Sequence, residues 1–216
     1  MADTAYEAIA DLLASGRVAP GERLSLRDMA EALGVSVMPV REAVSRLIAD
    51  QALEVAPNRA VRVPIMTAKA FRELARIRAE VEGFAAAEAA LRREAADLDA
   101  IAEAEAAFRQ EGFLNERASD RAVPLNRDVH FAIYRAARMP LLMQMIGGLW
   151  LKAGPVINLD LRDSPERLNK GHARECHAAA WAAIEARDPA AAREAIARDI
   201  TLAADYIIGR GGLPSG

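Results

Sequence analysis

The sequence has a single cysteine, Cys176, and aromatic residues make up only 5% of its 216 positions. One cysteine excludes an intramolecular disulfide and zinc sites built from paired cysteines, so a reducing cytoplasm is the compartment we expect. No run of eighteen apolar residues occurs, and the first residues lack a basic stretch followed by an apolar one. We therefore expect neither a membrane span nor secretion.

An excess of positive charge is also missing. The 28 lysines and arginines are outnumbered by 31 aspartates and glutamates, and residues 1–64 hold seven arginines, no lysine and nine acids. The total charge would not draw such a chain to nucleic acid, because attraction to phosphates needs a positive surface. Any DNA binding must therefore come from a local surface.

Helix-forming residues are what the sequence has in quantity. Alanine is abundant, and the 13 glycines and 10 prolines lie mostly at segment ends, which favours long helices over many short strands. Pro64 restricts the residue before it to extended geometry, and Thr67 can cap the helix that follows. We predict a mainly α protein with an N-terminal unit over 1–66, a C-terminal unit over 67–208 and a flexible tail over 209–216.

The N-terminal unit is predicted to hold three short helices and a small β-hairpin. Ser25 can cap the second helix and Gly34 can end it in a left-handed conformation. Ser36 then begins the third helix, which we expect to run to about residue 50. Apolar and polar residues alternate at 53–55 and 61–63, as in a hairpin. Two helices joined by a short turn, followed by a hairpin, are typical of a winged helix-turn-helix.

The third helix offers residues that could contact DNA. At helical spacing, five side chains fall between the apolar positions and point away from the core: Val37, Met38, Arg41, Glu42 and Ser45. Arg41 could bind guanine or phosphate, whereas Val37 and Met38 could make only apolar contacts, for example with a thymine methyl. Arg59 and Arg62 of the hairpin could hold phosphates or enter the minor groove. The alternative, an ordinary solvated helical face, has about equal weight for an isolated motif.

The C-terminal unit is predicted to be an antiparallel bundle of long helices. On the first of them, Phe71, Leu74, Ile77, Val81 and Phe84 recur at helical spacing, which predicts one buried face. Prolines after capping residues, or at helix starts, mark most of the breaks. The predicted helices span 67–92, 95–117, 120–138, 140–160, 165–187 and 189–208.

Two histidines, an aspartate and an asparagine in this bundle form a candidate metal site. Asn126 and His130 are four residues apart and share a helix face. His177 lies eleven residues before the predicted turn at Asp188, and Asp199 lies eleven after it, so the two reach the same level of a helical hairpin. These groups would leave coordination positions open on zinc or nickel, where water or a small acid could bind. Hydrogen bonds made separately at helix surfaces are the plainer alternative, and spacing alone favours them.

Two neighbouring residues fit the site less well. His172 is five residues before His177 and off its helix face, which suits an outer or surface role. Cys176 points about 100° round the helix from His177, so we expect a buried, inert thiol.

Three segments of the N-terminal unit resemble the GntR family of bacterial transcription regulators: Pro20-Gly21-Glu22-Arg23-Leu24, Met29-Ala30-Glu31-Ala32-Leu33-Gly34-Val35-Ser36 and Pro39-Val40-Arg41-Glu42-Ala43-Val44-Ser45-Arg46-Leu47. The resemblance implies that a set of residues lies at the operator: Arg27, Ser36, Val37, Met38, Arg41 and the wing tip Asn58, Arg59 and Ala60. Arg and Thr are more usual at the places of Val37 and Met38, and Gly at the place of Ala60. These departures bear on base preference and wing insertion.

The C-terminal unit resembles the FCD ligand-binding domain of the FadR-type branch of that family, from about 68 to 208. The residues that carry this resemblance are Arg78 with Val81-Glu82, Asn126-Arg127-Asp128-Val129-His130, the stretch from His177 to Asp188, and Asp199-Ile200. It implies a metal held by Asn126, His130, His177 and Asp199, with Asp199 standing where the family has histidine. It also implies that Arg78 meets an effector carboxylate, whereas spacing alone predicts a helix ion pair between Arg78 and Glu82.

These observations predict a transcription regulator and not an enzyme. We expect a repressor that binds a palindromic operator as a homodimer and releases it when a small organic acid enters the bundle. The alternative is a metal-dependent hydrolase or lyase, for which Asp128 and Glu175 are the nearby carboxylates that could act as general base. Neither carboxylate lies clearly on the ligand face. A purely structural winged helix is a third interpretation, and it leaves the converging polar residues unexplained.

Overall fold

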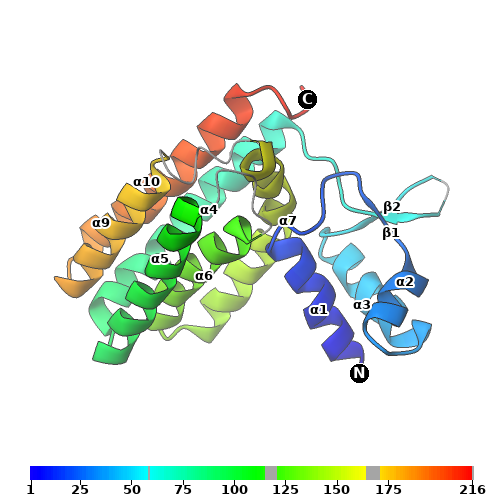
Figure 1. Ribbon diagram of the computed structural model, residues 1–216, viewed down its shortest axis with the longest axis horizontal. Coiled ribbons are helices and arrows are strands. Elements are labelled where there is room, and N and C mark those ends of the chain that lie inside the picture. The colour runs from blue at the N-terminus through cyan, green and yellow to red at the C-terminus, as the bar shows by residue number, and fades with distance from the viewer. Residues whose placement is uncertain (58, 115–120, 164–170, 216) are drawn as a thin grey trace.

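A computed structural model describes residues 1–57, 59–114, 121–163 and 171–215. The chain forms a small N-terminal domain beside a larger bundle of helices, and α1 (Ala2–Ala14) lies between the two (Figure 1). The predicted fold class is confirmed: the protein is mainly helical, with a winged helix-turn-helix followed by a helical bundle. None of the helices in the described ranges is long and apolar enough to cross a membrane.

The N-terminal domain adds two helices and a small sheet to α1: α2 (Leu26–Ala32), α3 (Val37–Ala49), β1 (Arg23–Leu24), β2 (Glu54–Val55) and β3 (Val61–Arg62). The predicted hairpin is β2 and β3, in which Val55 lies opposite Val61. The sequence did not predict β1, which pairs with the other edge of β3 and extends the hairpin to three strands. Strand β1 has only two residues, so its sequence shows no alternation of apolar and polar side chains.

Local capping and an aliphatic core hold this domain together. The Ser25 side chain accepts a hydrogen bond from the Asp28 backbone N–H at the start of α2, as predicted. Ser36 precedes α3 as predicted, although its side chain makes no capping bond. The fully buried side chains include Ile9, Leu13 and Leu47 from α1 and α3. Helix α3 is therefore fixed by its inner face, which leaves the outer face for contacts with other molecules.

The C-terminal bundle has six long helices within the described residues: α4 (Ala68–Arg92), α5 (Ala95–Leu114), α6 (Ala122–Ala136), α7 (Pro140–Asp163), α9 (Ala173–Glu185) and α10 (Pro189–Gly209). Most of them begin and end close to the predicted residues, but α9 begins at Ala173 and not at the predicted residue 165, because the chain still turns at Gly171 and His172. The caps expected from Thr67 and Asp188 are confirmed, since both side chains accept backbone hydrogen bonds. Ser164 and Pro165, predicted to begin the helix before His172, lie outside the described residues, as do 115–117 and 120.

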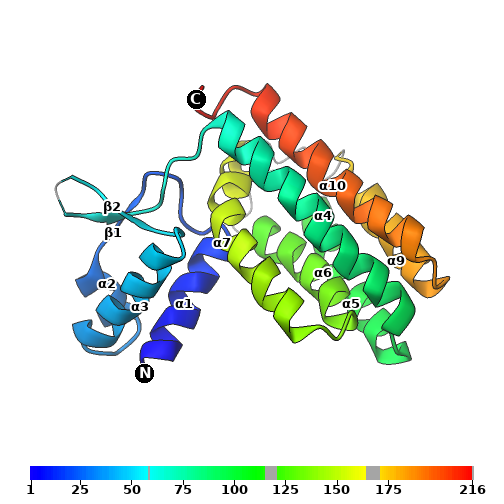
Figure 2. The ribbon, with the colours of Figure 1, turned by 180° about the vertical axis from the view of Figure 1, so that it is seen from behind.

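The buried face of α4 agrees with the prediction at Phe71 and Leu74 but differs farther along the helix. Ile77 and Phe84 are 45% and 39% exposed, whereas Arg78 and Glu82 are buried. Helix α4 packs closely along α10 (Figure 2), and many of the buried residues of the two helices are alanines. Close helix packing favours small side chains, and Ile77 and Phe84 point outward. Helical spacing alone could not separate the two faces, because both carry apolar residues.

The tail, predicted to be flexible, lies against the bundle at Leu213 and Pro214. The carbonyl of Pro214 accepts a hydrogen bond from the N–H of Ala68 at 3.0 Å, and Leu213 packs against the core. The first turn of a helix has N–H groups without helical partners, so the tail supplies an acceptor that α4 needs.

Helix α1 docks directly on α7 and joins the two domains. A β-carbon at Gly154 of α7 would collide with the carbonyl oxygens of Leu13 and Ala14 at the end of α1. Beside this contact, Arg127 of α6 donates to Asp11 of α1 at 2.6 Å. Burial acts to raise the pKa of Asp11, but hydrogen bonds and charge from Arg127 and Arg17 outweigh it and lower that pKa. The domains are therefore joined by close packing and an ion pair.

Candidate functional site

The exposed face of α3 is the candidate DNA surface. Four of the predicted contact residues, Ser36, Met38, Arg41 and Ser45, line one hollow of about 610 Å³ together with Met1, Ala2, Pro39 and Glu42. Met38 is 69% exposed, so its apolar side chain is accessible to another molecule. Arg41 makes no ion pair with any described residue and is therefore available to guanine or phosphate.

The other predicted DNA contacts are more widely spread. Arg27 is exposed on α2, while Val37 is half-buried and packs partly against the core. Arg59 is exposed at the hairpin tip with a positive φ of 63°. Asn58 lies outside the described residues. Arg62 is paired with Glu54 at 2.6 Å, which makes it less available to phosphate than Arg59.

Acidic residues of α1 are turned away from this hollow. Asp3 pairs with Arg46 at 2.7 Å, and Asp11 pairs with Arg17 and Arg127. Asp3 and Asp11 line the groove between the domains, not the hollow at α3. Asp3 and Asp11 therefore place no negative charge beside the candidate DNA contacts, whereas Glu42 lines the same hollow as Arg41.

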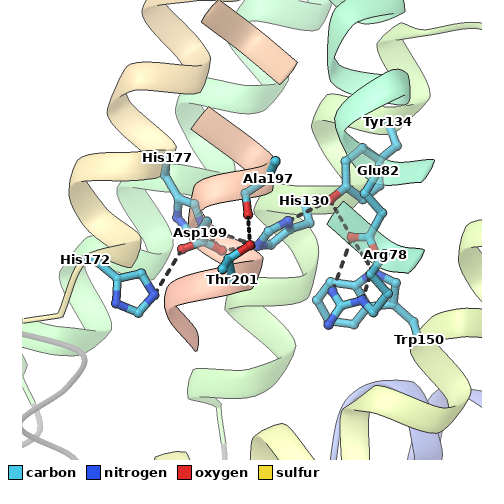
Figure 3. A network of polar contacts seen from close by, with 10 residues as sticks. All are labelled: Arg78, Glu82, His130, Tyr134, Trp150, His172, His177, Ala197, Asp199 and Thr201. Atoms are coloured by element: carbon cyan, nitrogen blue, oxygen red, sulfur yellow. Dashed lines mark hydrogen bonds and ion pairs between the residues drawn. The ribbon is translucent and has the colours of Figure 1, made fainter. Parts of the chain in front are cut away.

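In the bundle, three predicted metal ligands from three helices converge (Figure 3). His130 lies on α6, His177 on α9 and Asp199 on α10. His130 Nε2 is 3.2 Å from Asp199 Oδ2 and 3.4 Å from His177 Nε2, and His177 Nε2 is 4.0 Å from the same carboxylate oxygen. The eleven-residue symmetry about Asp188 thus brings His177 and Asp199 to one level, as the sequence indicated.

Burial and neighbouring groups hold two members of this cluster in the protonation states that metal ligands need. Desolvation lowers the pKa of His177 to about 4, so this imidazole is neutral near pH 7. Burial opposes the charge of Asp199, but the neighbouring side chains of His130, His177 and His172 keep its pKa well below the usual value. The site therefore presents a neutral imidazole at His177 and a carboxylate at Asp199.

The donor set fits a divalent metal ion. Ligand atoms of a tetrahedral zinc ion with bonds of 2.0–2.1 Å lie about 3.3 Å apart, near the separations within the cluster. His177 Nδ1 and Asp199 Oδ1 are buried and have no hydrogen-bond partner among the described residues. Such unpartnered atoms are costly in a core, and metal coordination at Asp199 would offset part of that cost.

Of the remaining candidates, His172 lies at the edge of the cluster, whereas Asn126 makes no hydrogen bond to it. Asn126 is half-buried one turn before His130, and its side chain makes no hydrogen bond to another described residue. His172 Nε2 is 3.6 Å from Asp199 Oδ1, so this histidine contacts the site although its spacing gave no sign of a ligand role. It precedes the first residue of α9, where helix-face arguments do not apply. Cys176 is buried as expected, and burial together with the charge of Asp199 raises its pKa to about 11.

Arg78 belongs to a buried network next to the cluster. It donates to Glu82 from Nε at 2.6 Å and from Nη2 at 3.2 Å, and its guanidinium lies 4.5 Å from the ring centre of Trp150. The i,i+4 ion pair that spacing predicted is therefore present. An effector carboxylate at Arg78 would have to compete with Glu82.

The carboxylates considered for an enzymatic role are not in the site. Asp128 and Glu175 are both exposed, whereas the cluster is buried. A general base must come within hydrogen-bond reach of the group it deprotonates, so neither residue suits a reaction at His130 and His177.

Comparison with known proteins identifies the two domains. Residues 1–63 match the bacterial regulatory proteins of the gntR family, and residues 73–202 match the FCD domain. The chain is 34% identical over 186 residues to the HTH-type transcriptional regulator McbR of Escherichia coli strain K12, covering 86% of this chain and 82% of McbR.

Solved structures extend the likeness to the whole fold. The structure of E. coli McbR/YncC matches with a TM-score of 0.86 at 30% identity and covers 98% of each chain. A Rhodococcus sp. RHA1 structure described as a GntR transcriptional regulator matches with a TM-score of 0.72 at 25% identity, covering 96% of this chain and 97% of that one. The chain therefore belongs to the GntR family, in the branch that carries an FCD domain, and is a DNA-binding transcription regulator.

Proposed function

We propose that the protein is a cytoplasmic repressor that binds a palindromic operator as a homodimer and releases it when a small organic acid binds in the FCD domain. The observation that carries this proposal is the buried cluster of His130, His177 and Asp199, which lies in a different domain from the exposed face of α3. A regulator needs two such separate sites, one for the effector and one for DNA.

The effector is proposed to bind through a divalent metal, zinc or nickel. His130, His177 and Asp199 would hold the ion, with Asn126 and His172 beside it. The bound ion would supply open coordination positions to the carboxylate of an organic acid. Arg78, already paired with Glu82, would act on the site through that pair and not as a free anion receptor.

Helix α6 is the proposed connection between effector and DNA. His130 faces the cluster, and Arg127, three residues earlier on the same helix, pairs with Asp11 of α1. Helix α1 in turn packs on α3, which carries Arg41. An acid that favours one position of α6 would thereby favour one placement of the DNA-binding domain, provided that it binds the two arrangements with different affinity.

A stripe of exposed apolar residues on α4 supports the proposed homodimer. Ile77, Phe84 and Leu91 recur every seven residues and are 39–54% exposed. Heptad spacing places side chains on one face, as in helix pairs that pack along their length. Two copies related by a two-fold axis would match the symmetry of a palindromic operator.

The test begins with selection of binding sites from randomised DNA duplexes, followed by fluorescence anisotropy with the selected duplex. We expect two-fold symmetric sites whose half-sites are about 10 base pairs apart. Arg41→Ala should weaken binding by about 1–3 kcal/mol, whereas Arg193→Ala, which removes the same charge from the exposed surface of α10, should not.

The effector arm adds a panel of small mono-, di- and tricarboxylic acids to the protein–DNA complex. We expect at least one acid to release the DNA, and EDTA or His130→Ala to abolish that release. Metal analysis of the purified protein should give a stoichiometric zinc or nickel ion that His130→Ala loses. Sites without two-fold symmetry, unchanged affinity in Arg41→Ala, or no bound metal would each refute the corresponding part of the proposal.

A further inference from the structure

A single buried carboxylate, Glu82, organises the polar network behind the cluster (Figure 3). It is fully buried and accepts four hydrogen bonds: from Arg78 Nε at 2.6 Å, Arg78 Nη2 at 3.2 Å, Tyr134 Oη at 2.6 Å and Trp150 Nε1 at 3.0 Å. An ionised carboxylate can only accept hydrogen bonds. The hydroxyl hydrogen of Tyr134 must therefore point at Glu82.

The direction of the hydrogen bond from Tyr134 to Glu82 fixes the direction of the hydrogen bond between Tyr134 and His130. His130 Nδ1 lies 2.8 Å from Tyr134 Oη. The phenol has one hydrogen, and Glu82 takes it, so toward His130 the phenol oxygen can only accept. The hydrogen of a neutral His130 ring is consequently on Nδ1, and Nε2 carries a lone pair.

On the other side of the His130 ring, the Nε2 lone pair faces a carboxylate oxygen, which is also an acceptor. His130 Nε2 is 3.2 Å from Asp199 Oδ2, a carboxylate oxygen with no hydrogen of its own to share. Two acceptors at this distance repel each other unless a cation lies between them. A metal ion at this point would bind to both, and a metal-bound histidine commonly donates its other N–H to an oxygen in this way.

We propose that Tyr134 and Glu82 are positioning residues: they hold His130 with its hydrogen on Nδ1 and its Nε2 lone pair directed at the metal position. Arg78 and Trp150 fix Glu82 and so belong to the same relay. This inference rests on the proposed metal site but makes a separate statement about the metal-free protein, namely which nitrogen of His130 carries hydrogen. It also gives the buried ion pair of Arg78 a role other than effector binding.

The first experiment reads the tautomer directly. The chain has three histidines, so ¹⁵N-histidine labelling and long-range ¹H–¹⁵N spectra at pH 8 give few signals, which His172→Gln and His177→Gln assign. In the metal-free protein we expect His130 to carry hydrogen on Nδ1 only. Hydrogen on Nε2 of the unaltered protein would overturn the proposal, and this measurement needs no Tyr134 variant to fold.

The second experiment removes the hydroxyl of Tyr134 with the variant Tyr134→Phe. The control variant is Tyr206→Phe, which removes the hydroxyl of an exposed tyrosine on α10. Tyr134→Phe should move the His130 hydrogen toward Nε2, where Asp199 can accept it, and weaken binding of Zn²⁺ about 10–100-fold by competition titration. Tyr206→Phe should change neither. An unchanged tautomer and Zn²⁺ affinity in Tyr134→Phe would refute the relay.

The two proposals fail in different ways. If Zn²⁺ binds neither the unaltered protein nor the variant but the tautomer still changes, the relay stands and the metal site is refuted. If Zn²⁺ binds both with equal affinity and the tautomer is unchanged, the metal site stands and the relay is refuted.

Discussion

His177 illustrates how burial can set the chemistry of one residue. The side chain is 1% exposed, its ring centre lies 5.2 Å from that of Phe108 with the two rings tilted, and desolvation lowers its pKa to about 4. An exposed histidine with an ordinary pKa near 6.5 would be partly protonated at pH 6 and would repel a metal ion. Burial therefore keeps His177 neutral, the form that can bind a metal ion, over the whole physiological range.

The same burial predicts acid sensitivity. The unfolded chain binds a proton at His177 below about pH 6.5, whereas the folded protein does so only near pH 4, so protons favour the unfolded state in between. Stability should fall by roughly 1.4 kcal/mol per pH unit as the pH decreases from about 6 to 4. Urea unfolding of metal-free protein across this range measures the slope.

His177→Gln is the control for this prediction, since glutamine does not titrate. Its unfolding free energy should depend less steeply on pH between 6 and 4 than that of the unaltered protein. Equal slopes in the two proteins would show that His177 does not carry the effect.

At the scale of elements, two glycines of α7, Gly154 and Gly148, have different structural roles. Gly154 meets the end of α1, where a β-carbon would strike two carbonyl oxygens, while a β-carbon at Gly148 would meet nothing within 4 Å. Gly154 thus permits the domains to approach, and Gly148 only lowers the helix propensity of α7.

Replacing each glycine by alanine separates these roles. Gly154→Ala should destabilise the protein by about 1–3 kcal/mol, because α1 must move away from α7. Gly148→Ala should be neutral or stabilise it by up to about 1 kcal/mol. Chemical denaturation of both variants tests the contrast, and equal stability of the two would contradict the close packing of α1 on α7.

The ion pair between α6 and α1 carries a prediction about coupling. Asp11→Asn removes the charge that Arg127 and Arg17 share. We expect metal content and operator affinity to stay within about threefold of the unaltered protein. The acid that releases DNA from the unaltered protein should still bind Asp11→Asn but should no longer change its affinity for DNA. Anisotropy titrations with and without the acid measure this.

Asp3→Asn is the matched control for Asp11→Asn. It removes the charge from an ion pair that lies inside the DNA-binding domain, between α1 and α3. This variant should keep the response to the acid. A full response in Asp11→Asn would show that the signal does not pass through the contact between α6 and α1.

At the scale of the whole molecule, the outer face of α4 is the candidate surface for self-association. A two-fold operator requires two recognition helices in fixed relation, and linking two weak half-sites raises the affinity of an acidic protein for DNA. The DNA-binding domain lies at one end of the molecule, and α4 runs along the bundle, so a partner could bind α4 without covering α3 (Figure 1).

Phe84→Glu tests this face. A charge in the middle of an apolar helix seam should convert the dimer to monomers and weaken operator binding, while α4 itself remains folded because residue 84 is partly exposed. Light scattering after size-exclusion chromatography gives the mass. Lys69→Glu, on an exposed part of the same helix outside the apolar stripe, should leave the mass unchanged. A Phe84→Glu dimer would place the interface elsewhere.

The features that sequence alone determined are those with local causes. Thr67 and Asp188 cap their helices because each side chain meets its own backbone, and the turn at Asp188 lies midway between His177 and Asp199, which sets their common level. The winged helix-turn-helix followed from apolar spacing and turn residues, and its likeness to a known family followed from short motifs.

Tertiary structure alone decided which groups meet across helices. No spacing within α4 or α6 could place Glu82 against Tyr134, bring His172 beside Asp199, turn Phe84 outward or fold Pro214 back onto Ala68. Each of these depends on how the helices pack. A capping hydrogen bond forms within one turn of the chain, so the local sequence determines it. The direction of the hydrogen bonds around His130 depends instead on side chains from four helices, α4, α6, α7 and α10, which pack around Glu82 and His130.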